Sequence, residues 1–158
     1  MVSQRLMARR LIAVAIGTVV ASLVAAPAAS ADPTGDLRSA VAAKRKNCPA
    51  LQQDPILDGV AERADRETQD YAQNIARFQP MEDPMPTLKQ LGYPAGKAKL
   101  LSGYSAPDRP DPQQRAIYGA TLFGWDTIPD CTYTRYGAHA MTNPVNGNAT
   151  SAVVLAGD

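Results

Sequence analysis

Few side chains in this sequence could carry acid–base or metal chemistry. His139 is the only histidine, whereas a transition-metal site usually needs several nitrogen or sulfur ligands. A serine triad would also depend on His139, and residues 103–107, Gly-Tyr-Ser-Ala-Pro, place proline where a nucleophile elbow requires glycine. The sequence contains neither a G-x-G-x-x-G nor a Walker motif. We therefore expect no catalytic residue, no metal and no cofactor.

Aromatic side chains crowd into one short part of the chain. Five of them fall within 19 residues, namely Tyr118, Phe123, Trp125, Tyr133 and Tyr136. Tyrosine and tryptophan often line small-molecule pockets, although the hydrophobic core is the default location for Phe123 and Trp125. The predicted ligand-binding residues are Tyr118, Trp125, Tyr133, Tyr136 and His139. The alternative for His139 is a polar residue at the edge of a sheet.

The two cysteines, Cys48 and Cys131, predict one disulfide bond. Their separation of 83 residues is unlike the Cys-x-x-Cys spacing of a redox site. In an oxidising compartment such a pair most simply forms a structural bridge, which for a loop of this length is worth roughly 4 to 5 kcal/mol in the chain-entropy model. The alternative is two free thiols or a redox pair.

The beginning of the chain has the pattern of a secretory signal peptide. Three arginines precede an uncharged apolar run of 16 residues from Leu11 to Ala26, which is shorter than the roughly 20 residues of a spanning helix. Ala29-Ser30-Ala31 then forms a small-x-small cleavage site. We expect residues 1–31 to be removed between Ala31 and Asp32, with the Sec or twin-arginine export route left open.

The remaining 127 residues, 32–158, are expected to form a single extracytoplasmic domain. This part has 13 basic and 15 acidic residues, and its net charge of −2 argues against nucleic acid and anionic membranes as main partners. It has no second apolar run long enough to span a bilayer. The Ala- and Arg-rich leader is typical of a high-GC bacterium.

The spacing of apolar residues, together with helix-start and turn signals, predicts helices in the first part of the domain and a hairpin at its end. Asp54-Pro55 is a helix start, with Asp54 as the N-cap, and Asn146-Gly147 is a hairpin signal. The predicted helices are 36–47, capped by Asp36, then 55–75, 86–91 and 112–124, the last opened by Asp111-Pro112. The predicted strands are 100–104, 131–141 and 151–155. This order predicts an α+β domain, with a small antiparallel sheet packed against helices.

The order of several short motifs resembles the CAP superfamily of cysteine-rich secretory, antigen 5 and pathogenesis-related proteins. Residues 48–57, Cys-Pro-Ala-Leu-Gln-Gln-Asp-Pro-Ile-Leu, are similar to its first long helix and lead-in. Leu91-Gly92-Tyr93 and Gly103-Tyr104-Ser105 resemble its Gly-Tyr and Gly-Glu-Asn region, and residues 128–137 resemble the segment that enters its C-terminal hairpin. The resemblance covers most of residues 36–156 through short segments, and it implies an α-β-α sandwich and a secreted habitat.

The positions that would form the family's metal site differ in this chain. The family's central cavity carries two histidines and acidic residues that can hold a divalent ion. Lys97 stands near the position of the Gly-Glu-Asn glutamate, Gly124 and Gln79 stand near the two histidine positions, and His139 lies too far along to replace either. The resemblance therefore implies a divergent member that lacks the metal-site residues and any hydrolytic role tied to them.

These observations together predict a non-catalytic domain that is secreted or held in the cell envelope. Its expected partner is a small apolar ligand, a lipid or an envelope component. One alternative is a protein-interaction or host-facing domain without a ligand pocket. The other is a hydrolase with an unrecognised site.

Overall fold

The computed structural model describes residues 32–158. The predicted signal peptide, residues 1–31, lies outside the described residues. The helices are α1 (Pro33–Lys44), α2 (Pro55–Ala72), α3 (Met85–Gln90) and α4 (Pro112–Phe123). The strands are β1 (Gln52–Gln53), β2 (Lys97–Ser105), β3 (Tyr133–Thr142) and β4 (Ala149–Gly157).

The strands form one sheet in the order β1-β3-β4-β2. β3 and β4 make the predicted antiparallel hairpin, and β4 is also antiparallel to β2. Gly147, with φ of +75°, sits in the hairpin turn, where the left-handed backbone favours glycine. β1 was not predicted, because its two residues carry no strand pattern; it pairs in parallel with β3 and makes the sheet mixed.

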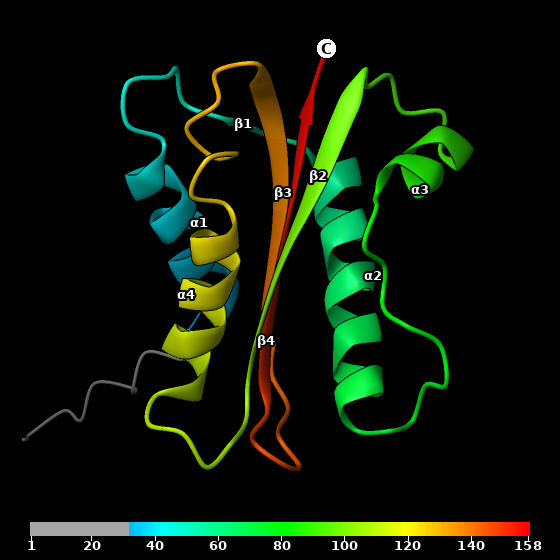
Figure 1. The fold of residues 1–158 in the computed structure, drawn as a ribbon, viewed down its shortest axis with the longest axis vertical. Helices are drawn as coiled ribbons and strands as arrows, with labels where there is room; N and C mark the ends of the chain where they lie inside the picture. The colour runs from blue at the N-terminus through cyan, green and yellow to red at the C-terminus, as the bar shows by residue number, and fades with distance from the viewer. Residues whose placement is uncertain (1–31) are drawn as a thin grey trace, which may run out of the picture. The chain divides into compact units, whose positions relative to one another are not determined.

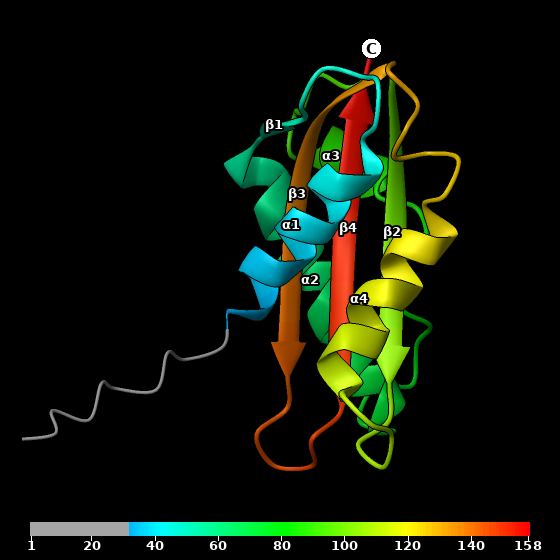
Figure 2. The ribbon, with the colours of Figure 1, turned by 90° about the vertical axis from the view of Figure 1, so that its left-hand side faces the viewer.

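Helices cover both faces of the sheet, which confirms the predicted α-β-α sandwich. α1 and α4 lie on one face, and α2 and α3 lie on the other (Figures 1 and 2). Each face has its own apolar core, one centred on Leu101 and Val153, the other on Leu100 and Val154. All nine residues of the central strand β4 are buried, because both of its faces are covered and both of its edges are paired.

Two glycines let helices approach the sheet closely. A Cβ atom on Gly103 of β2 would lie 2.8 Å from the backbone nitrogen of Ala120, so α4 packs directly on the strand. A Cβ atom on Gly137 of β3 would overlap the backbone of Leu57 at the start of α2. A side chain at either glycine would therefore separate the helix from the sheet.

Two of three predicted helix starts agree with the structure, those of α2 at Pro55 and α4 at Pro112. The Asp54 side chain caps α2 by accepting from Ile56 N at 2.9 Å, as predicted. The predicted cap of the first helix was wrong: α1 begins at Pro33, and the Asp32 side chain accepts from Gly35 N at 2.9 Å. The α4 prediction was also wrong in its cap, since Asp111 is left-handed with φ of 49° and its side chain makes no capping hydrogen bond.

The loops that precede β1 and β3 are joined by a disulfide and by a buried arginine. Cys48 and Cys131 form the predicted bridge. The Arg45 guanidinium beside it donates to four main-chain carbonyls, those of Pro49 (2.9 Å), Ile128 (2.7 Å), Asp130 (2.8 Å) and Tyr133 (2.6 Å). Burial lowers the pKa of this guanidinium, but the four carbonyl dipoles satisfy its charge locally. Together the two links fix the start of β3.

Candidate functional site

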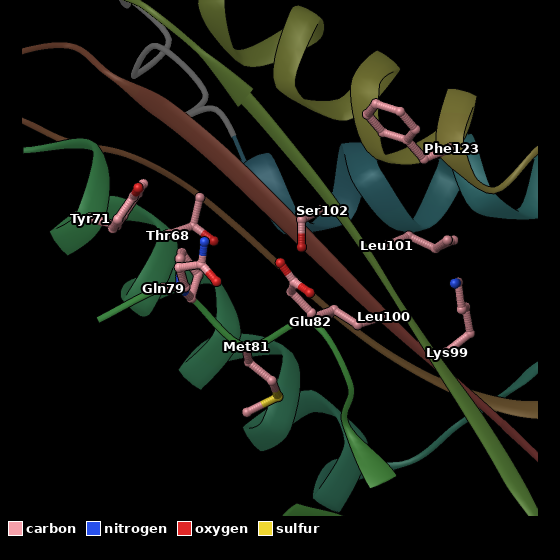
Figure 3. A pocket seen from close by; sticks show the side chains of 11 residues that line it. Thr68, Tyr71, Gln79, Met81, Glu82, Lys99, Leu100, Leu101, Ser102 and Phe123 are labelled. Atoms are coloured by element: carbon pink, nitrogen blue, oxygen red, sulfur yellow. The ribbon is translucent and has the colours of Figure 1, made fainter. Parts of the chain in front are cut away.

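A groove of about 660 Å³ runs along β2, between the C-terminal part of α2, the segment 79–82 and the end of α4. Four consecutive strand residues, 99–102, line it, and Tyr71 and Phe123 stand at its two sides (Figure 3). This volume is in the range of common small-molecule sites. The groove is larger than three other hollows in residues 32–158, which have volumes of about 200, 460 and 370 Å³.

The side walls of the groove are aromatic and exposed. Tyr71 lies in the last turn of α2 and is 48% exposed, and Phe123 is the last residue of α4 and is 70% exposed. Burying side chains of this kind against a ligand releases roughly 1.5–3 kcal/mol each when burial is complete. Met81 adds a flexible apolar side chain on the α2 side. The walls therefore favour a ligand with apolar groups.

Two oppositely charged side chains also line the groove. Lys99 lies on β2 and Glu82 lies in the loop that follows α2, and both are exposed. Neither takes part in an ion pair within residues 32–158. Thr68 and Ser102 each add a hydroxyl group to the lining. A ligand with polar or charged groups beside its apolar parts would match this lining.

The five predicted ligand-binding residues do not surround one cavity. Tyr118 and Trp125 are 62% and 72% exposed on and just after α4. Tyr133 and Tyr136 are half-buried against the core on the α1 and α4 side, and Tyr136 lines a small groove of about 200 Å³ beside Cys48. The core expectation for Phe123 and Trp125 was wrong: α4 meets β2 through small residues and buries Ile117, whereas Phe123 at its end and Trp125 just after it are exposed.

His139 points to the opposite face of the sheet, toward α2. Its Nδ1 atom lies 2.8 Å from Oδ2 of Asp65, whose side chain is fully buried. Burial raises the pKa of the Asp65 carboxyl, and the hydrogen bond with His139 partly opposes that rise. Ser105 hydrogen-bonds the main chain of Ala106 and not His139, so the predicted elbow serine and the histidine form no triad.

The resemblance placed a family histidine near Gln79, and that residue lines the groove with an amide group. Among residues 32–158, no three His, Cys, Asp or Glu side chains are grouped so that they could hold a metal ion. No helix in the same part of the chain is both long and apolar enough to cross a membrane.

Sequence comparison gives no match to a protein-family model or to a curated protein. Two solved structures are similar in fold. An outer surface protein from Borrelia burgdorferi has a TM-score of 0.58 and 15% identity, over 78% of this chain and 90% of that one. A cysteine-rich secretory protein from Staphylococcus aureus subsp. aureus Mu50 has a TM-score of 0.54 and 10% identity over 80% of this chain.

The second comparison supports the CAP-like fold that the motif order indicated. This chain spans 38% of the length of the staphylococcal protein, so the likeness concerns one domain of that protein. At 10% and 15% identity the likeness shows the fold alone. The class defined here is therefore an α-β-α sandwich with one disulfide, similar in fold to these two structures.

Proposed function

We propose that residues 32–158 form an extracytoplasmic, non-catalytic binding domain, and that its ligand occupies the groove along β2. The Cys48–Cys131 disulfide supports an oxidising compartment, and so does the leader pattern of residues 1–31. Two proteins of similar fold are named as an outer surface protein and a secretory protein.

The observation that carries the proposal is the pair of exposed aromatic walls. Large exposed aromatic side chains that border one hollow are typical of a binding groove. Tyr71 and Phe123 meet this description on opposite sides of the strand (Figure 3). The ligand therefore carries apolar groups, with a polar part that matches the charges of Lys99 and Glu82.

The positions of the titratable side chains support binding without catalysis. The His139 ring is held by a buried carboxylate on the far side of the sheet from Phe123. The groove itself contains hydroxyl, amide and amine groups, together with the single carboxylate of Glu82. Within residues 32–158, neither hydroxyl of the groove hydrogen-bonds to Glu82 or Lys99, as an activated nucleophile would to its base; Thr68 donates to Ala64 O instead.

The test is binding of the apolar fluorophore 1-anilinonaphthalene-8-sulfonate to the exported, oxidised protein, with native mass spectrometry of protein purified from its own host. Phe123→Ala should weaken fluorophore binding by about tenfold, since it removes one wall. Trp125→Ala is the matched control, because Trp125 is equally exposed but does not line the groove. Equal loss in both variants, or none in either, would contradict the proposal.

A further inference from the structure

The two edges of the sheet are treated differently. On the β3 edge, β1 pairs with Arg135 and Tyr136. Beyond that pair, side chains hydrogen-bond to the main chain of β3. The Asp58 carboxylate accepts from Ala138 N at 2.9 Å, and Thr34 Oγ1 accepts from Ala140 N at 3.1 Å. The main chain of the β3 edge is therefore closed by hydrogen bonds, which is how proteins prevent another strand from pairing there.

The β2 edge has no such closure. β2 pairs with β4 along all nine residues from Lys97 to Ser105. No other group within residues 32–158 hydrogen-bonds to its main chain, so its outer row of N–H and C=O groups is free for another chain. β2 forms the outer border of the sheet in Figure 2. An open strand edge is a template for an added strand.

The groove straddles this open edge. Successive side chains of a strand point to opposite faces, and here Leu100 packs in the core under α2 while Leu101 packs in the core under α4. A groove lined by residues 99–102 in succession must therefore include both sides of β2 and its border. Tyr71 stands on the α2 side and Phe123 on the α4 side (Figure 3).

This geometry selects a particular kind of ligand. An extended peptide presents its side chains alternately to the two faces of a sheet. Neighbouring side chains of such a peptide could therefore contact Tyr71 on one face and Phe123 on the other. Its main chain also carries N–H and C=O groups that can pair with the free N–H and C=O groups of the β2 edge. The two charged groups of the lining are also on different elements: Lys99 is on β2, and Glu82 is in the loop beside α2.

We infer that the occupant of the groove is an extended segment of another protein that adds to β2 as a fifth strand. The segment carries apolar side chains on both faces, with an acidic residue beside Lys99 and a basic residue beside Glu82. The inference rests on the proposed binding function and names its ligand class. Lys97 does not block this edge, because its ammonium is held by Asp130 and by the Tyr133 ring.

The experiment selects nine-residue peptides from a random display library on the oxidised protein and then tests their main chain. The best peptide is N-methylated on its odd residues in one version and on its even residues in another. An added strand faces β2 with one alternate set of amides only. One version should therefore bind at least about tenfold more weakly, and the other should bind as the parent does.

Side-chain variants test the placement in the groove. Lys99→Glu should weaken binding of an acidic peptide, and replacing the acid of the peptide by lysine should restore it. Phe123→Ala should weaken binding about tenfold, and Trp125→Ala should leave it unchanged. Failure of the charge exchange to restore binding would overturn the assignment of Lys99 to the site.

Other outcomes separate this inference from the function on which it rests. Equal tolerance or equal loss for both methylated versions would overturn strand addition. So would fluorophore binding that depends on Phe123 when no peptide is recovered, and that result would leave the proposed function standing. If the protein neither selects a peptide nor binds the fluorophore through Phe123, both the strand-addition inference and the proposed binding function are rejected. A wild-type dimer that peptide cannot displace, seen by sedimentation, would assign the edge to a second copy of this chain and overturn the inference.

Discussion

Removing the Cys48–Cys131 disulfide is expected to lower the free energy of unfolding by about 4–5 kcal/mol. The bridge joins residues 83 apart, and the chain-entropy relation gives a link across such a loop about 4.5 kcal/mol at 25 °C. Domains of this size are stabilised by roughly 5–15 kcal/mol in total. The bridge thus accounts for a large part of the difference between a folded and an unfolded chain.

The folded state should change little when the bridge is removed. Arg45 still donates to the carbonyls of Ile128, Asp130 and Tyr133, so the segment before β3 keeps its place. The effect is therefore expected to lie in the unfolded chain, which becomes less restricted. The dependence of stability on urea concentration should also become steeper, because an uncrosslinked unfolded chain exposes more surface.

The assay is urea unfolding followed by far-ultraviolet circular dichroism. Wild-type protein is compared with the double variant Cys48→Ala, Cys131→Ala. Reductant provides the control, since it should bring the wild type to the stability of the double variant and leave the variant unaffected. A loss below about 1 kcal/mol would refute the loop-length reasoning.

Three further changes test other contacts by the same unfolding assay. Arg45→Met should cost about 3 kcal/mol, because it leaves buried carbonyls without their donor; a cost near zero would contradict this. Asp65→Asn should gain stability relative to wild type as pH rises above about 4, since burial raises the pKa of that carboxyl in the folded state and its ionisation opposes folding; a pH-independent difference would exclude this. Gly103→Ala should cost about 1–3 kcal/mol by pushing α4 from the sheet, whereas Gly59→Ala, in open space on α2, should be neutral or stabilising.

Local signals in the sequence were enough to predict much of the fold. Asp54-Pro55 predicted the start of α2 because the cap and the proline act within one turn. The Asn-Gly turn predicted the hairpin for a similar reason. β1 was missed, because a two-residue parallel strand depends on a neighbour that lies far away in sequence.

The groove was harder to predict, because it depends on how close the helices lie to the sheet. Phe123 looks like a core residue by type, and only the contact of α4 with Gly103 shows why it points outward. Tyr71 fits the apolar stripe of α2, but the stripe extends beyond the part of the helix that covers the sheet centre. One signal in the sequence could have indicated the groove: Phe123 is an aromatic residue at the end of a predicted helix, next to Gly124.

The position of β4 affects when the domain can fold. β4 comes last in the order of elements, yet it lies at the centre of the sheet and is the neighbour of both long strands. Until this nine-residue strand has been synthesised, β2 has no strand partner and β3 can pair only with the two residues of β1. A chain exported from its N-terminus through a translocation channel would therefore remain unfolded until β4 had passed through. The sheet would then assemble on the far side of the membrane.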